Sequence, residues 1–294
     1  MSPPFQVKKV ADEGSSSPFV ARLFLGLLGF RDSLHLLAVE GQHREQMRDH
    51  FDRKFKPMFE AARASRDAAV DVGCLVATHL DAIEDGRALR FTGNQYDVLE
   101  TIDIPLSQAV HKVLGQGIVA TKTGLQEILR DPLGLDIGFL FQHDTQFNKG
   151  IADLWASGEN HLAQYLQDVR SGWLSGFQKL RNQYEHDGWS LADVEYQLAG
   201  PSTVTVRLPT ILSLPVDKYV GHTANRVLLF MENTMVYAMQ RQCMQRQYRC
   251  PIFVAEIPND QRDLANPQRF RLAARGLDRT PPWAIAYRDD MDFV

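Results

Sequence analysis

Between residues 162 and 184, apolar side chains recur at every third or fourth position, and this spacing restricts the fold more than any other feature of the chain. Such a period places apolar side chains on one face of a long amphipathic helix. Asp187-Gly188 follows directly, and glycine readily adopts the left-handed conformation that ends helices. We therefore predict a helix over about residues 158 to 187, with a buried stripe of Leu162, Leu166, Val169, Trp173, Phe177, Leu180 and Tyr184.

The last turns of this helix carry the hexapeptide Arg181-Asn182-Gln183-Tyr184-Glu185-His186, which has the form R-N-x-x-x-H. At about 100° per residue, Asn182 and His186 lie one turn apart on the face opposite the stripe, whereas Arg181 lies at its edge. One interpretation is purely structural. Arg181 then pairs with Glu185 at i, i+4, and His186 complements the negative end of the helix dipole.

The other interpretation is chemical, because the same residue types suit the cleavage of RNA without a metal. That reaction needs a base or orienting group near the 2′-hydroxyl, a proton donor for the 5′-oxygen and positive charge on the transition state. His186 titrates near neutrality, and Arg181 offers a fixed fork of donors to phosphate. Asn182 can hold the histidine or a phosphate oxygen by hydrogen bonding. Arg181, Asn182 and His186 are therefore the candidate catalytic residues.

The motif and the segment after it resemble the HEPN superfamily, helical proteins in which R-N-x-x-x-H near a helix end carries metal-independent endoribonuclease activity. The resemblance covers about residues 138 to 245. It implies a site shared by the motif helices of a homodimer, which also suits a motif whose arginine and histidine lie on different helix faces. Gly188 stands where some HEPN toxins have a modified tyrosine, so that form of regulation is not supported. The downstream match consists of Gly188-Trp189, Val194-Glu195-Tyr196, Leu208-Pro209, Leu214-Pro215-Val216, Asn225 and Glu232-Asn233.

The rest of the chain predicts a mainly α fold, an HEPN-like helical bundle with an inserted β-hairpin and a small C-terminal β segment. Helices are expected over about 18–37, 40–69 with a kink or a split at Pro57, 104–129 with interruptions at Gly115 and Gly117, 137–156 and 216–245. Residues 71–83 fit a helix or a strand. Alternating residues at 194–198 and 203–208 predict the hairpin, and strand-like runs occupy 252–257, 270–273 and 283–287.

These elements divide the chain into a flexible lead-in (1–17), a helical domain (18–249) and a β-rich appendage (250–294). Within the motif helix, Gly172 and Gly176 are spaced i, i+4, which predicts either a bend or the close approach of another backbone, such as that of a dimer partner.

Composition limits the choice of function. The chain has 32 Lys+Arg against 36 Asp+Glu, which argues against coating nucleic acid by bulk charge, so any RNA contact must be local. Three scattered cysteines favour a reducing cytoplasm over a disulfide framework or a thiolate zinc site. We see no export signal or membrane span, since the apolar run at 19–30 is short and is broken by Arg22.

Other candidate sites are weaker. Arg241, Arg246 and Arg249 could contact RNA phosphates, although a solvated helix end is the simpler interpretation. No dinucleotide, Walker or serine-hydrolase motif is present, so we expect no cofactor. We also expect no metal, because the histidines and acids between residues 35 and 52 lack ligand spacing and are treated as surface residues: His35, Glu40, His43, Asp49, His50 and Asp52.

The sequence therefore predicts a metal-independent endoribonuclease of HEPN type that cleaves RNA by 2′-hydroxyl attack. The resemblance suggests use as a toxin or anti-phage effector, with RNA, a second copy of the chain and an antitoxin or regulatory protein as partners. Two alternatives stay open. One is a catalytically silent HEPN-like module that binds RNA, a nucleotide or a protein, and the other is a helical scaffold in which the motif is accidental.

Overall fold

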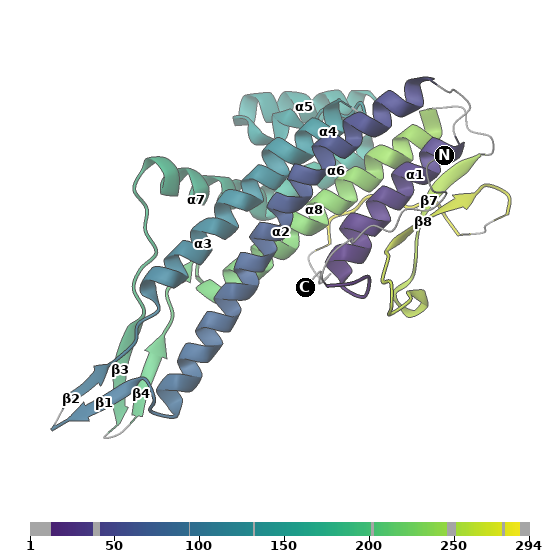
Figure 1. The fold of residues 1–294 in the computed structure, drawn as a ribbon. Helices are drawn as coiled ribbons and strands as arrows, with labels where there is room; N and C mark the ends of the chain where they lie inside the picture. Colours follow the sequence, from purple (N-terminus) through teal and green to yellow (C-terminus); the bar gives the residue numbers. More distant parts are fainter. Residues whose placement is uncertain are drawn as a thin grey trace. The chain divides into compact units, whose positions relative to one another are not determined.

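A computed structural model describes residues 13–37, 42–93, 95–131, 133–200, 203–245, 251–277 and 280–288. As predicted, the chain is mainly helical and carries small antiparallel strand pairs (Figure 1). The α-helices are α1 (Leu27–Leu37), α2 (Gln42–Glu84), α3 (Asp103–Ile118), α4 (Gln126–Arg130), α5 (Asp144–Ala156), α6 (Asn160–Val169), α7 (Ser175–His186) and α8 (Val216–Gln245).

Wider π-helical turns adjoin several of these helices, and two short 3-10 turns lie elsewhere in the described chain. A π-helical segment precedes α1, a second joins α3 to α4, and a third joins α6 to α7. The expected helix at 137–156 is not continuous, because Gln142 and His143 are extended and separate a short 3-10 turn from α5. The π segments are Phe19–Gly26, Val119–Leu125 and Arg170–Leu174, and the 3-10 turns are Gly138–Phe141 and Asn259–Gln261.

The described strands form four separate two-stranded antiparallel pairs. The hairpin predicted after the motif is present as β3 (Glu195–Gly200) and β4 (Thr203–Arg207), in a register that pairs Tyr196 with Val206. The other pairs are β1 (Leu89–Thr92) with β2 (Gln95–Val98), β5 (Thr210–Ile211) with β6 (Leu214–Pro215), and β7 (Ile252–Glu256) with β8 (Phe270–Ala274).

Two compact units make up the described chain, and each is built from segments far apart in the sequence. Unit 1 takes the described parts of 1–59, 124–168 and 228–294, and unit 2 takes those of 60–123 and 169–227. Residues 250–294, expected as an appendage, are thus counted with the first helices and with most of α8. The predicted domain boundaries themselves stay a prediction.

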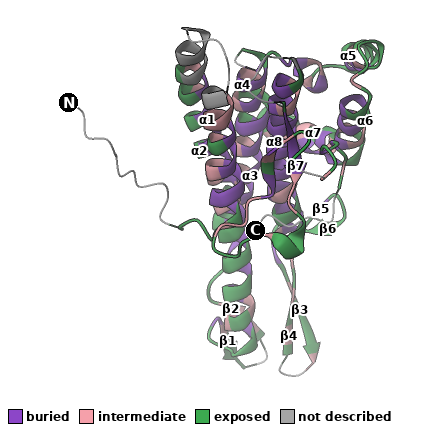
Figure 2. Ribbon diagram, turned by 90° about the vertical axis from the view of Figure 1, so that its right-hand side faces the viewer, coloured by how far each residue is buried: buried purple, intermediate pink, exposed green. Residues whose placement is uncertain are grey.

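Helix α8 supplies the centre of unit 1. Every residue from Leu228 to Met239 is buried, so this stretch is covered on all sides (Figure 2). Met231, Met235 and Met239 are fully buried, as expected for methionines that fill a core. The sequence pattern predicts an apolar side only, yet the buried stretch also contains the polar run Glu232-Asn233-Thr234.

Around α8, unit 1 adds aromatic and β elements. Phe19 stacks on Phe59, with ring centroids 4.8 Å apart, which fixes the first π segment against α2. The two expected strands at 252–257 and 270–273 form as β7 and β8. The third run, 283–287, is not a strand, although the Trp283 N–H donates to the Val254 carbonyl at 2.8 Å and its ring packs edge-on against Phe270.

Unit 2 contains the end of α2, α3, α7 and the hairpins. Residues 71–83 are helical, because α2 runs unbroken from Gln42 to Glu84 and continues through Pro57. Ser65 in α2 donates to the Val113 carbonyl of α3 at 3.0 Å. The expected interruption at Gly115 and Gly117 does not occur, since α3 continues to Ile118 and then into a π segment.

Candidate functional site

The motif helix ends where the sequence predicts. Helix α7 stops at His186, and Gly188 takes a left-handed conformation with φ of 68°. The N–H groups of Asp187 and Trp189 both donate to the Gln183 carbonyl, at 2.9 and 3.1 Å. The last turn, which carries the motif histidine, is therefore closed by its own backbone.

The expected single helix over 158–187 is interrupted by the π segment Arg170–Leu174. Val169, Trp173 and Phe177 are spaced by four, and such a row drifts by about 40° per step on an ideal α-helix. A wider turn offsets that drift, and all three residues are buried. Within this chain, a Cβ built on Gly176 would lie 3.3 Å from Leu212 Cδ1. The close approach of a dimer partner at Gly172 and Gly176 stays a prediction.

Two contacts hold α7 against α3. A Cβ on Gly117 would lie 3.0 Å from Phe177 Cζ, so the glycine makes room for the phenyl ring. Nearer the motif, the His111 ring of α3 stacks on Tyr184, with centroids 3.7 Å apart. Burial lowers the pKa of His111 and so favours the neutral form of this stacked ring. Tyr184, expected in the core, is half-buried in this stack.

The motif side chains themselves gather around one carboxylate. Arg181 NH2 lies 2.6 Å from Glu185 Oε2, and His186 Nε2 lies 3.8 Å from the same oxygen. Arg181 NH1 also donates to Asn182 Oδ1 at 3.2 Å. Residues five apart point about 140° apart on an ideal helix. The Arg181 guanidinium and the His186 imidazole nevertheless both lie within 4 Å of the same Glu185 oxygen.

Exposure differs among these residues in a way that matters for chemistry. The His186 side chain is 69% exposed and the Arg181 side chain 25%. The Arg181 Nε atom is buried and makes no hydrogen bond within the described residues. The arginine is thus anchored along its stem with its terminal nitrogens turned to Glu185, whereas the histidine is open to solvent. The i, i+4 ion pair of the structural interpretation is present, and a phosphate approaching Arg181 must displace Glu185 from it.

The residues beyond the motif are tied back to unit 2. The Val194 N–H donates to Asp103 Oδ1 at the start of α3, at 2.7 Å. Tyr196 of β3 then shares a 2.8 Å hydrogen bond with the buried His79 of α2. These contacts fix the hairpin that follows the motif. Neither partner can be inferred from the sequence, because Asp103 and His79 lie about a hundred residues upstream.

Of the three arginines predicted to contact RNA, the structure describes only Arg241. Arg241 belongs to unit 1, where Nε donates to Glu159 at 2.8 Å and NH1 to the Gly134 carbonyl at 2.8 Å. Tyr237 also donates to Glu159. Arg241 therefore links α8 to Glu159, the residue that precedes α6. Its contact with RNA stays a prediction, and Arg246 and Arg249 lie outside the described residues.

The predictions on metal ions and membrane spans concern clusters of ligands and long apolar helices. Within the described ranges, no three His, Cys, Asp or Glu side chains are grouped so that they could hold a metal ion. His50 lies 3.6 Å from Asp131, and Glu40 lies outside the described residues. None of the described helices has the length and apolar character that a membrane span requires.

Comparison with known proteins adds no assignment. No family model, no curated protein and no solved structure matches this chain.

Proposed function

We propose that this chain is a metal-independent endoribonuclease of HEPN type, with Arg181, Asn182 and His186 as its catalytic residues. The observation that carries the proposal is the convergence of Arg181 and His186 on Glu185 Oε2 at the end of α7. A carboxylate oxygen that both groups reach stands where a phosphate oxygen of RNA would bind. The hairpin β3–β4 and the long helix α8 follow the motif, in the order that the resemblance implies.

Each residue has a definite task in this proposal. The Arg181 guanidinium stabilises the negative charge that develops on the phosphorane, and its anchored stem limits the entropy lost on binding. His186, whose imidazole is open to solvent, moves a proton to or from the 2′-hydroxyl or the 5′-oxygen. Asn182 positions the Arg181 fork through its 3.2 Å hydrogen bond.

A second copy of the chain completes the site in this proposal. One α7 supplies one Arg181 and one His186, so the separate base and acid of the reaction come from two motif helices related by a twofold axis. RNA is the substrate, and an antitoxin or regulatory protein is the expected antagonist if the enzyme serves as a toxin or anti-phage effector.

The test is cleavage of total RNA by the purified chain in EDTA, with the fragment ends determined. We expect 2′,3′-cyclic phosphate ends, and we expect Arg181→Ala and His186→Ala to abolish cleavage. His222→Ala and Arg207→Ala are matched controls, because both residues are exposed in unit 2 and lie outside the motif. Intact RNA at high protein concentration, or equal cleavage by all variants, would overturn the proposal. RNA binding that survives without cleavage would favour the silent module.

A further inference from the structure

The polar run inside α8 is the centre of a buried ion network in unit 1. Glu232 is 1% exposed and accepts two hydrogen bonds from Arg22, from Nε at 2.9 Å and from NH2 at 2.5 Å. Arg269 NH1 donates to Glu232 at 3.2 Å and to Asn233 Oδ1 at 2.7 Å. Burial alone would raise the pKa of Glu232, but the two arginines outweigh it and hold that pKa below its usual value.

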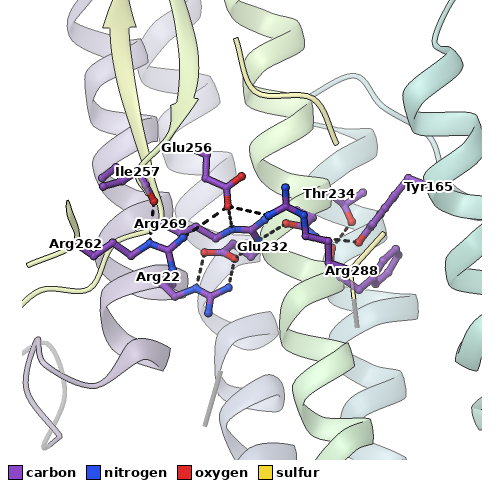
Figure 3. A network of polar contacts seen from close by, with 11 residues as sticks. Arg22, Tyr165, Glu232, Thr234, Glu256, Ile257, Arg262, Arg269 and Arg288 are labelled. Atoms are coloured by element: carbon purple, nitrogen blue, oxygen red, sulfur yellow. Dashed lines mark hydrogen bonds and ion pairs between the residues drawn. The ribbon is translucent and has the colours of Figure 1, made fainter. Parts of the chain in front are cut away.

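A second carboxylate, Glu256 on β7, is surrounded by arginines. Arg269 Nε donates to Glu256 Oε1 at 2.8 Å. Arg262 and Arg288 approach the same oxygen, at 3.6 and 3.8 Å. Figure 3 shows the three guanidinium groups converging on Glu256 from different segments of the chain. One carboxylate oxygen therefore serves three cations.

Arg262 and Arg288 lack the contacts that satisfy the inner arginines. Separations of 3.6 and 3.8 Å are too long for hydrogen bonds. Arg262 Nε donates to the Ile257 carbonyl at 3.0 Å, and within the described chain its terminal nitrogens make no hydrogen bond. The Arg262 side chain is 14% exposed and that of Arg288 52%. The two unsatisfied forks thus lie where solvent reaches the network.

The described network also carries excess positive charge. Four arginines, Arg22, Arg262, Arg269 and Arg288, face two glutamates, Glu232 and Glu256, which leaves two positive charges uncompensated. Burial lowers the pKa of Arg262, and repulsion from Arg22 and Arg269 lowers it further. Arg22, Arg262 and Arg269 are largely removed from solvent, and like charges so placed are unfavourable unless an anion joins them. Arg288 brings a further positive charge to the solvent side.

We propose that Arg262 and Arg288, at the rim of this network, form a binding site for a phosphate group, either inorganic phosphate or a phosphate monoester. A phosphate monoester carries a charge of about −1.5 to −2 at pH 7, which matches the excess. Its oxygens accept hydrogen bonds from the arginine fork in the bidentate geometry that Glu256 does not provide to these two residues. A carboxylate ligand has the fork geometry but only half the charge. The site is independent of the proposed ribonuclease motif.

The experiment measures binding to the whole chain by isothermal titration and by thermal unfolding. The probes are inorganic phosphate and adenosine 5′-monophosphate, with chloride at matched ionic strength as the reference. We expect saturable binding and a rise in Tm that chloride does not reproduce. Tighter binding of the nucleotide than of inorganic phosphate would identify a monoester as the ligand, and the reverse would identify free phosphate. Either result supports the site.

Variants locate the binding. Arg288→Gln changes an exposed side chain and leaves the buried ion pairs intact, and we expect it to weaken phosphate binding about tenfold, as for loss of one charged hydrogen bond. Arg262→Gln has the same expected effect and is checked for folding by circular dichroism. Arg271→Gln, on exposed β8 surface, is the matched control and keeps full binding.

Three outcomes would overturn the site. The first is the absence of saturable binding to the wild-type chain. The second is an equal loss in Arg271→Gln, which means bulk charge. The third is binding only after the two aspartates that follow Arg288 in the sequence are replaced, Asp289→Asn with Asp290→Asn, which means that the chain itself competes for these arginines.

Discussion

His79 Nε2 and the Tyr196 hydroxyl share a 2.8 Å hydrogen bond across 117 residues of sequence, and this contact ties hairpin β3–β4 to helix α2. Burial lowers the pKa of His79 from 6.5, and Asp103 and Glu100 only partly oppose that shift. Burial lowers the pKa of His111 in the same way. Unit 2 thus contains two histidines whose pKa is lower in the folded chain than in the unfolded chain.

Stability should therefore fall in mild acid. The unfolded chain binds protons at these histidines near pH 6.5, whereas the folded chain resists them, so the free energy of unfolding is highest above pH 6.5 and decreases below it. Urea unfolding at pH 7.5 and 5.5 measures the difference. His79→Gln should reduce it, and the exposed His222→Gln should leave it unchanged. An identical pH dependence in all three proteins would contradict the assignment.

Loss of Glu232 should be among the most damaging single changes in unit 1. Glu232→Gln removes the buried carboxylate that Arg22 pairs with and leaves Arg269 only Glu256, and removal of one partner of a buried ion pair costs about 3–5 kcal/mol. Denaturant unfolding gives the value. Glu195→Gln is the matched control, since its pair with Arg207 is exposed and contributes about 0–1 kcal/mol. Similar losses for both variants would show that burial does not decide the effect.

Gly124 should not tolerate even one methyl group. A Cβ there would lie 2.6 Å from Met58 Cβ and 3.0 Å from Met58 Cα, so the backbone of α2 would have to move. We expect Gly124→Ala to destabilise the chain by about 1–3 kcal/mol. Gly115→Ala, in α3 with nothing within 4 Å, should instead stabilise it by up to about 1 kcal/mol. Thermal unfolding of the two variants side by side decides whether packing or helix propensity governs these sites.

If the chain is the proposed ribonuclease, the ion pair between Glu185 and Arg181 should lower its activity. This 2.6 Å ion pair occupies the donors of Arg181 that RNA phosphate needs. Glu185→Gln should therefore raise kcat/KM for RNA cleavage about two- to fivefold, the range set by loss of a partly exposed ion pair. The same change in a His186→Ala background should strengthen RNA binding. A drop in activity would mean that Glu185 itself takes part in the reaction.

The helices could be predicted because their evidence is local. The spacing from Leu162 to Tyr184, the stop at Gly188 and the alternation around Gly200 each need only a few neighbouring residues, and the structure confirms α7, its end and the hairpin. Predictions were wrong where distant contacts decide. Gly117 does not interrupt α3, where it makes room for the Phe177 ring. Pro57 does not split α2, and a kink there stays a prediction.

In the candidate site, too, the features set by local sequence could be predicted and the contacts between distant segments could not. The positions of Arg181 and His186 on the last turns of a helix follow from periodicity, and so does the pair of Arg181 with Glu185. The stacking of His111 on Tyr184 joins residues of two helices, and the sequence of neither helix predicts it. The burial of the polar run Glu232-Asn233-Thr234 likewise depends on distant residues, because Arg22 donates to Glu232 and Arg269 donates to Asn233.

The pairing of Arg22 with Glu232 also has a consequence during synthesis. The two residues are separated by 210 positions, so at about 5–20 residues per second the ribosome takes roughly 10–40 s to make the second after the first. Throughout that interval the apolar segment Phe19–Gly26 lacks the helix that covers it. Unit 1 therefore cannot complete its core until the part of α8 that carries Glu232 has been made.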